Sequence, residues 1–261
     1  MTQPHAGTGG EAVPAPSPPS LAGRVALVTG GSGGIGKAIA GRLAAEGLSI
    51  AVSYGSRARP AGELASQITA AGGKAAAFQA DLRRAEAAGE LVTAVEDALG
   101  PVDVLVSNAG LGRAQPLEEI FAGDFDEMIA VNLRAPFLLA QRALPAMRDR
   151  GFGRILFMSS IAAFTGGIVG PHYAASKAGL HGLTHYLAAR VASDGITVNA
   201  LAPALIAETG MLPGSPEELA SRIPVGRLGR PGEVAGMALA MLANPYLTNQ
   251  VVSLDGGMYP R

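Results

Sequence analysis

Short apolar runs alternate with longer amphipathic or alanine-rich segments from Arg24 to the end of the chain. Most of the short runs are rich in Val and Ile and bounded by Gly, Pro or Asp, which is typical of buried strands. These predicted strands cover residues 24–29, 48–54, 74–80, 102–107, 154–159, 196–201 and 250–254. The segments between them predict helices over residues 34–46, 60–71, 84–99, 124–149, 172–193 and 231–243.

This alternation indicates the α/β class, because strands that are apolar on both faces need helices on both sides of a parallel sheet. Right-handed crossovers then make the sheet doubly wound. We find no internal repeat or linker, so residues 23–261 are predicted to form one domain. Residues 1–22 are rich in Pro, Gly, Ala and Ser and lack the basic and apolar regions of a secretory signal. We expect them to form a disordered tail.

Composition excludes several functions. Hydrophobic residues make up 48% of the chain and charged residues 16%, with a formal net charge of −1. We therefore expect neither nucleic acid nor an anionic membrane surface as a partner. The chain has no cysteine, which excludes disulfides and thiolate catalysis. No apolar run reaches the ~18–20 residues that span a bilayer. The expected compartment is the cytoplasm.

A glycine-rich turn follows the first predicted strand in "VALVTGGSGGIG" (25–36) and opens the first predicted helix. Glycines allow positive φ and a close approach of the backbone to a pyrophosphate, while the helix start offers free N–H groups. This context predicts dinucleotide binding rather than a merely flexible loop. The residues expected to contact the cofactor here are Gly30, Ser32, Gly33, Gly34, Ile35 and Gly36.

Tyr173 and Lys177 are four positions apart in "GPHYAASKAGLHG" (170–182), so they share one helix face. Such pairs are common on protein surfaces. Together with the glycine turn, however, the pair resembles the short-chain dehydrogenase/reductase family, over residues 24–258. The resemblance implies a seven-stranded Rossmann-type sheet, NAD or NADP as cofactor, and usually a homotetramer. It also implies a catalytic set of Asn132, Ser160, Tyr173 and Lys177, with Ser160 thirteen residues before Tyr173.

The residue types in this set suit reduction of a ketone, which needs a hydride on carbon and a proton on oxygen. A free tyrosine has a pKa of ~10, and the Lys177 cation would lower it towards the operating pH. The Lys177 ammonium can also donate to the nicotinamide ribose. Ser160 would donate to the carbonyl where negative charge develops. We expect Asn132 to hold a water that relays protons through Lys177.

The resemblance implies further cofactor contacts. "VSNAG" (106–110) matches a family turn and assigns Asn108, Ala109 and Gly110, although Asn108 can equally be structural. "QADL" (79–82) assigns Asp81, with Leu82, to the adenine. The contacts implied for the nicotinamide half of the cofactor come from Tyr173, Lys177, Pro203 and Ile206. After Pro203 the chain departs from the family pattern, because Ala204 replaces a glycine and Glu208 replaces a threonine, with Thr209 one position later.

The end of the second strand favours NADPH over NADH. A carboxylate at this place would repel a 2′-phosphate. Here the strand ends in "AVSYGSRARP" (51–60), so Tyr54 stands where the acid would lie. Ser53, Ser56 and Arg57 could bind the phosphate, Arg57 through a charged fork. The alternative is that Arg57 and Arg59 are only solvated loop residues. The glycine turn also argues against NADPH, because this chain has Gly33 where many NADPH-dependent members carry a basic residue.

"SYGSR", "IPVGRLGRPGEV" and "VVSLDGGMYP" look most like 3-oxoacyl-[acyl-carrier-protein] reductases. The resemblance implies NADPH-dependent reduction of a 3-oxoacyl thioester, on acyl-carrier protein or CoA, to the 3-hydroxyacyl form. Substrate choice should lie in residues 202–234. For docking of an acidic carrier, Asp194 is unfavourable, although basic residues lie nearby at Arg148, Arg150 and Arg154. The alternatives are another ketone or secondary alcohol, or a non-catalytic nucleotide-binding regulator.

Three histidines lie on or beside the predicted helix with Tyr173: His172, His181 and His185. His181 and His185 are one turn apart, but no third ligand has a recognisable metal-binding spacing. We therefore predict no metal site and a structural or interface role for these two histidines.

Overall fold

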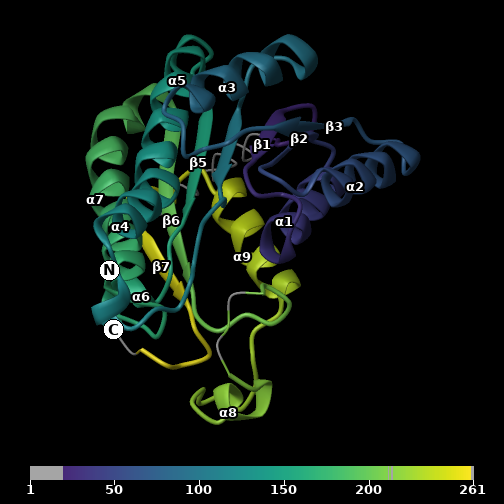
Figure 1. The fold of residues 1–261 in the computed structure, drawn as a ribbon. Coiled ribbons are helices and arrows are strands. Elements are labelled where there is room, and N and C mark those ends of the chain that lie inside the picture. Colours follow the sequence, from purple (N-terminus) through teal and green to yellow (C-terminus); the bar gives the residue numbers. More distant parts are fainter. Residues whose placement is uncertain (1–19, 211, 213, 260–261) are drawn as a thin grey trace, which may run out of the picture.

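A seven-stranded parallel sheet forms the centre of the protein, in a computed structural model that describes residues 20–210, 212 and 214–259 (Figure 1). The strand order is β3-β2-β1-β4-β5-β6-β7, and every neighbouring pair is parallel. This confirms the predicted α/β fold class with its doubly wound sheet. The strands are β1 (Val25–Val28), β2 (Ser49–Tyr54), β3 (Ala75–Gln79), β4 (Val104–Ser107), β5 (Gly153–Met158), β6 (Ile196–Pro203) and β7 (Val251–Leu254). Residues 1–19 of the predicted tail lie outside the described residues.

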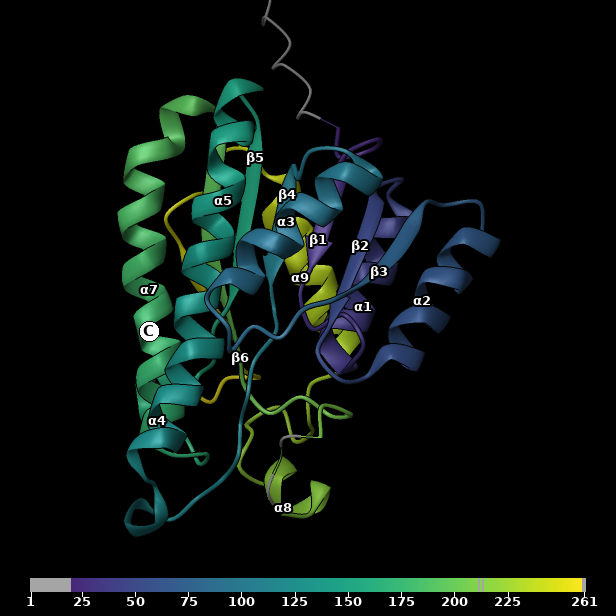
Figure 2. The same cartoon turned by 45° about the horizontal axis from the view of Figure 1, so that its top comes forward.

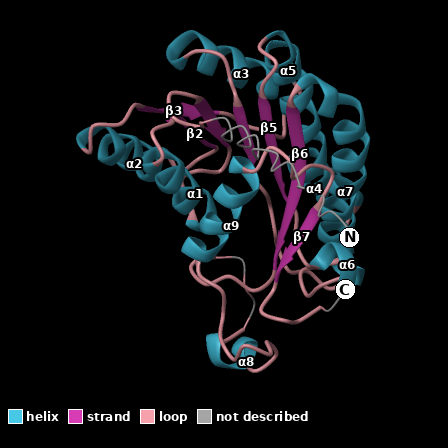
Figure 3. Cartoon of the chain, turned by 180° about the vertical axis from the view of Figure 1, so that it is seen from behind, coloured by secondary structure: helices cyan, strands magenta, loops and turns pink. Residues whose placement is uncertain are grey.

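The sheet is covered on both faces (Figures 1 and 3). One face carries α1 (Gly34–Ala45), α2 (Ala58–Ala70) and α9 (Pro231–Ala243), and the other carries α3 (Glu86–Leu99), α5 (Ala135–Asp149) and α7 (Pro171–Val191). Strand alternation divides the core in two. Val28 packs with Ile39 and Val234 in one cluster, whereas its neighbour Leu27 packs with Leu139 and Leu180 in the other. Because both faces of the central strands β1, β4, β5 and β6 are buried, these strands read as continuous apolar runs.

The strand order reverses between β1 and β4. The chain runs outward from β1 to β3, returns to β4 beside β1, and then runs outward again to β7. The connections leaving β1 and β4 therefore diverge at the carboxyl edge of the sheet. In open α/β sheets, such a switch point is where ligands bind.

The helix predicted over residues 124–149 is wrong in detail. The structure has α4 (Ala122–Ile129), a π-helical turn (Ala130–Arg134) and then α5. Pro136 lies at the start of α5 and has no N–H to donate to the carbonyl of Asn132. The wider turn accommodates that missing bond, and it contains Asn132. Single π turns of this kind are frequent at functional sites.

Several short elements were not predicted. They are α6 (Ala162–Thr165), α8 (Pro216–Ala220) and 3-10 turns at Leu117–Glu119 and Ala192–Asp194. Figure 2 shows α8 beyond the carboxyl ends of the strands, away from the helices that cover the sheet. Such short helices carry too few residues for a periodic pattern. Within residues 20–210, 212 and 214–259, no helix is long and apolar enough to cross a membrane.

Candidate active site

Two cavities, of about 450 and 540 Å³, lie along the carboxyl ends of the strands. Both are lined by Gly30, Arg57, Ala109 and Gly110, so they form one groove across the switch point between β1 and β4. The smaller cavity extends to Tyr173 and the larger to Asp81. We call these the catalytic end and the adenosine end of the groove, after the roles that the sequence predicts for Tyr173 and Asp81.

The glycine turn after β1 is shaped for close backbone packing. Gly30 has φ of 64°, and a Cβ there would lie 2.9 Å from the Cα of Ala109. A Cβ at Gly36 would collide with the Gly30 carbonyl oxygen. No side chain caps the amino end of α1, so its first-turn N–H groups stay available at the floor of the groove. A glycine turn with uncapped N–H groups fits the pyrophosphate of a dinucleotide.

Asn108 holds this turn together. Its Nδ2 donates to the carbonyls of Thr29 (3.0 Å) and Gly30 (3.3 Å), while its backbone N–H donates to Thr29 Oγ1 at 3.0 Å. Ala109 N also donates to Thr29 Oγ1, at 2.9 Å. The sequence left a structural or a cofactor role open for Asn108. These bonds give it the structural role, although it also lines the groove.

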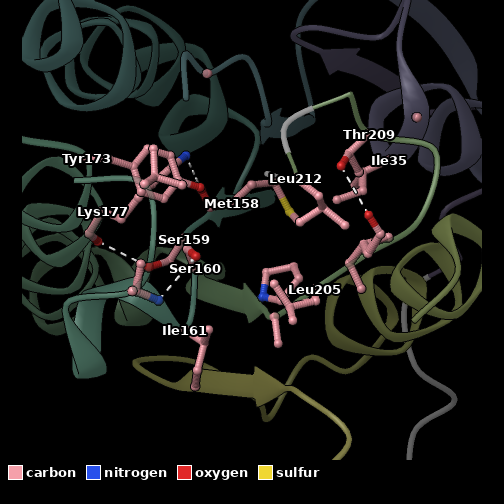
Figure 4. A pocket seen from close by; sticks show the side chains of 18 of the residues that line it. Ile35, Met158, Ser159, Ser160, Ile161, Tyr173, Lys177, Leu205, Thr209 and Leu212 are labelled. Atoms are coloured by element: carbon pink, nitrogen blue, oxygen red, sulfur yellow. Dashed lines mark hydrogen bonds between the residues drawn. The ribbon is translucent and has the colours of Figure 1, made fainter. Parts of the chain in front are cut away.

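Tyr173, Lys177 and Ser160 meet at the catalytic end (Figure 4). Tyr173 and Lys177 lie one turn apart on α7, and Lys177 Nζ lies 5.8 Å from the centre of the Tyr173 ring. Ser160 follows β5 and lines the cavity beside Tyr173, where its hydroxyl acts to lower the pKa of the phenol. Lys177 Nζ donates to the carbonyl of Met158 at 2.8 Å. The spacing of these residues in the sequence thus corresponds to a cluster in space.

Burial dominates the proton affinities of this cluster. Lys177 is 5% exposed, and desolvation of the ammonium lowers its pKa to about 8. Tyr173 is 9% exposed, and desolvation of the phenolate raises its pKa, against the opposing hydrogen bond with Ser160. The pKa of Tyr173 is therefore raised and not lowered as expected, because burial outweighs the other contributions.

Asn132 lies beneath the groove and does not line it. The side chain is fully buried, and its Oδ1 accepts from Leu111 N at 2.8 Å. Its Nδ2 donates to Leu111 O at 3.0 Å and to Ser176 Oγ at 3.1 Å. Asn132 thereby joins the π-helical turn to the segment after β4 and to α7. A Cβ on Gly110 would lie 3.3 Å from both Asn132 Oδ1 and Lys177 Nζ, so both atoms face this glycine.

The segment after β2 contributes Ser56 and Arg57 to the groove, but Ser53 and Tyr54 line neither cavity. Ser53 is 2% exposed within the sheet, and Tyr54 packs against the core, so these two predicted contacts are wrong for the side chains. The Arg57 guanidinium lies where a side chain at Gly33 would be. Arg57 therefore supplies positive charge at the position where the glycine turn lacks a basic residue.

Asp81 and Leu82 line the adenosine end, as does Ser32. Both carboxylate oxygens of Asp81 accept from Arg83, at 2.8 Å each. This fork holds the pKa of the Asp81 carboxyl below its usual value. The sequence did not predict the pairing, although Arg83 is only two residues away.

The wall of the catalytic end comes from two segments. The first segment lies within the predicted range 202–234. It contributes Pro203, Leu205, Ile206, Thr209, Leu212 and Arg222. Glu208 takes φ of 62°, and Thr209 Oγ1 donates to Ile206 O at 3.0 Å, so Thr209 reaches the cavity despite its shifted position. The second segment was missed: Ile161, Ala162, Thr165, Gly167, Ile168 and Val169, joined by Met258. Their position directly after β5 was the available signal.

Comparison with known proteins identifies the family. A family model described as short chain dehydrogenase matches residues 24–220. A "3-oxoacyl-[acyl-carrier-protein] reductase" from Synechocystis sp. is 38% identical, over 92% of this chain and 98% of that protein. A "Hydroxynaphthalene reductase-like protein Arp2" from Metarhizium brunneum is also 38% identical, over 92% of this chain and 97% of that protein. A crystal structure of a blue fluorescent protein from a metagenomic library, in complex with NADPH, is 39% identical with a TM-score of 0.87, covering 93% of this chain and all of that one.

The fold and the dinucleotide groove thus define an NAD(P)-dependent oxidoreductase. The chain belongs to the short-chain dehydrogenase family. Across the described ranges, no group of three His, Asp or Glu side chains could hold a metal ion.

Proposed function

We propose that the protein reduces a ketone to a secondary alcohol with NADPH, and that the ketone is a 3-oxoacyl thioester. The observation that carries the reaction type is the cluster of Tyr173, Lys177 and Ser160 at one end of a dinucleotide groove, in which Tyr173 and Lys177 are buried. When bound, the reduced nicotinamide supplies the hydride that reaches the carbonyl carbon. The chain's own residues supply the proton and the polar contacts.

Tyr173 is the proton donor in this proposal. Its raised pKa keeps the phenol protonated at neutral pH, so it can give its proton to the carbonyl oxygen as negative charge develops there. Ser160 donates a hydrogen bond to the same oxygen and stabilises the developing charge. Lys177, with a pKa of about 8, carries a positive charge at pH 7 that favours the phenolate left behind. Asn132 fixes the π-helical turn and α7 around them, and we retain it as the group that holds a relay water.

Positive charge beside Gly33 supports NADPH. Arg57 makes no ion pair with the described residues and reaches the glycine turn, where its guanidinium can bind a 2′-phosphate through two N–H groups. Ser56 lines the same part of the groove. The other candidate contacts along the groove are the glycine turn, Asp81, Leu82, the Asn108–Gly110 turn, Pro203 and Ile206.

An apolar wall with a cation supports an acyl substrate. Ile161, Ile168, Leu205 and Met258 line the catalytic end, and Arg222 is the charged residue on the α8 side. No carboxylate appears among the described residues that line this cavity. An acyl chain suits the apolar surface, and Arg222 suits an anionic group remote from the ketone. The relatives named as 3-oxoacyl-[acyl-carrier-protein] reductases support the same class.

The basic residues considered for carrier docking are occupied. Arg148 pairs with Asp194 at 2.9 Å, Arg150 pairs with Asp103 at 3.1 Å, and Arg154 is buried. These three side chains therefore present little free positive charge to an acidic carrier. A carrier would have to be recognised elsewhere, so a small thioester is the better first substrate to test.

Turnover measurements test the proposal. Oxidation of NADPH and NADH is followed with acetoacetyl-CoA, with its N-acetylcysteamine thioester and with a bicyclic aromatic ketone. We expect the highest kcat/KM for NADPH with a 3-oxoacyl thioester. Turnover of the aromatic ketone alone would favour the second candidate, reduction of aromatic ketones, to which the hydroxynaphthalene reductase-like relative points. NADPH binding without turnover of any ketone would favour a regulator instead.

We also propose that the protein assembles as a homotetramer. Phe121 and Phe125 at α4 and Phe137 on α5 are exposed, as is Tyr186 on α7. Exposed aromatic side chains on neighbouring helices are typical of surfaces that bury against another subunit. Light scattering at micromolar concentration tests this, and a monomer with full activity would contradict it.

A further inference from the structure

Ser159 lies between two residues that take part in the catalytic cluster. Met158 before it accepts the hydrogen bond of Lys177 Nζ, and Ser160 after it lines the cavity with Tyr173. Ser159 itself is buried, and its hydroxyl donates to the backbone carbonyl of Lys177 at 3.1 Å (Figure 4). The end of β5 and helix α7 are thus joined twice, through the side chain and through the carbonyl of the same lysine.

His181 completes this connection from the next turn of α7. Its Nε2 lies 2.8 Å from Ser159 Oγ. A serine hydroxyl has one hydrogen, so the tautomer of His181 decides which partner receives it. In the tautomer with the proton on Nε2, His181 donates to Ser159 Oγ and Ser159 donates to the Lys177 carbonyl. In the other tautomer, Nε2 accepts the Ser159 hydrogen, and the bridge between β5 and α7 remains.

The His181 ring is held in turn by aromatic packing. The ring of Phe164, in α6, lies 4.6 Å from it between centroids, at 33°. Phe164 also stacks on Tyr259 near the end of the described chain, at 5.7 Å. Since Ala162 and Thr165 of α6 line the catalytic cavity, His181 contacts both the end of β5 and the helix that forms part of the cavity wall.

We propose that His181 is a positioning residue for ketone reduction, acting through Ser159 to set where Ser160 and Lys177 lie relative to Tyr173. The proposal rests on the proposed catalytic roles of these three residues. It needs no metal and no change in the charge of His181. The physical reason is that Ser160 is a loop residue after β5, whereas Tyr173 and Lys177 are fixed to α7. Without the bridge, the loop can shift against the helix, and a displacement of about 1 Å in a catalytic group can reduce turnover by about a hundredfold.

Two variants at position 181 separate the hydrogen bond from the packing. His181→Phe keeps an aromatic ring beside Phe164 and removes the donor. His181→Gln removes the ring and keeps an N–H donor with a similar reach. We expect His181→Phe to lower kcat by roughly tenfold while the Kd for NADPH stays within about twofold, because the groove itself is unchanged. His181→Gln should recover most of the lost kcat.

Ser159→Ala tests whether the two residues act through one path. It should lower kcat about as much as His181→Phe does, and the double variant should be no worse than either single one, because both remove the same bridge. His185→Phe is the matched control: it makes the same change one turn further along α7, where the ring bonds with Asn249 at 2.6 Å, away from the groove. We expect its kcat to equal that of the wild type.

Three results would overturn the inference: wild-type kcat in His181→Phe, a loss that His181→Gln does not recover, or additive losses in the double variant. Circular dichroism spectra establish that each variant is folded. Tyr173→Phe, measured alongside, keeps this test distinct from that of the catalytic assignment. If Tyr173→Phe is inactive and His181→Phe is fully active, only the positioning role is wrong. If Tyr173→Phe keeps its turnover, the assignment of the proton donor is wrong.

Discussion

The two ends of the groove are built in different ways. At the catalytic end, polar side chains are buried and bond with fixed groups: Lys177 with the Met158 carbonyl, and Asn132 with the Leu111 backbone. At the adenosine end, Asp81 and Arg83 are largely exposed side chains that bond with each other. The first arrangement is fixed before any ligand arrives. The second consists of side chains that can exchange partners when a ligand binds.

This difference shows at which end of the groove a functional side chain lowers the stability of the fold. Burying the Lys177 ammonium costs folding free energy, which is the physical meaning of its pKa of about 8. The exposed ion pairs at the other end contribute little to stability. Substitutions at the catalytic end should therefore change both turnover and stability, whereas those at the adenosine end should change ligand preference alone.

The largest effect is expected for Tyr173→Phe. The ring still packs beside Met128 and Ala162, so the fold and NADPH binding should be preserved. The proton donor is lost, and general acid catalysis typically contributes a factor of about 10²–10⁴, so we expect kcat to fall about a thousandfold. Steady-state kinetics with saturating NADPH measure the loss. A variant that retains most of its kcat would show that another group protonates the alkoxide.

Lys177→Met should lower kcat by about a hundredfold, which is a smaller loss than that expected for Tyr173→Phe. It should also raise the stability of the folded protein. At pH 7 the lysine is protonated in the folded and unfolded states, so the full cost of its burial is present. Replacing it with an apolar side chain of similar length should raise the free energy of unfolding by about 2 kcal/mol, after allowing for the lost bond to Met158. Thermal unfolding at pH 7 measures this.

The pH dependence of stability gives the control for Lys177→Met. The folded pKa is about 8, and the unfolded chain titrates near 10.4. Between these values the unfolded chain binds more protons, so this group makes wild-type stability rise with pH from about 8 to about 10.4. The variant lacks that rise, so its advantage should shrink steadily across the same window. A constant difference between the two proteins would show that Lys177 is not buried as a charged group.

The same contrast explains what the sequence could predict. That Ser160, Tyr173 and Lys177 lie together could be predicted because they stand at a strand end and on one helix face, whose positions follow from the chain spacing. Asp81 was assigned to the adenine, but its pairing with Arg83 depends on exposed rotamers that no spacing determines. Ser53 and Tyr54 were misplaced because strand alternation and core packing, not proximity in sequence, decide which side chains face the groove.

His181 shows a different limit. Two histidines one turn apart gave no reason to prefer one, and the structure separates them: His181 bonds with Ser159, and His185 with Asn249 at the surface. The π-helical turn at Asn132 was also beyond the pattern, because the predicted helix continued through it without a break in apolar periodicity. Pro136 was the visible signal, but a proline in the first turn of a helix is also an ordinary helix start.

The smallest effect, and the one that tests the adenosine end, is expected for Arg57→Gln. Its guanidinium lies beside Gly33, in the exposed part of the groove, so removing it should not alter folding. A charge-assisted contact to a 2′-phosphate would be lost, and we expect kcat/KM for NADPH to fall about tenfold while that for NADH stays the same. Arg59→Gln is the matched control, because this arginine is 88% exposed, lies two residues away and pairs with Glu63 at 3.8 Å. It should change neither cofactor's kcat/KM. Equal losses with NADPH and NADH in Arg57→Gln would mean that Arg57 contacts a part common to both cofactors, and the preference for NADPH would then need another cause.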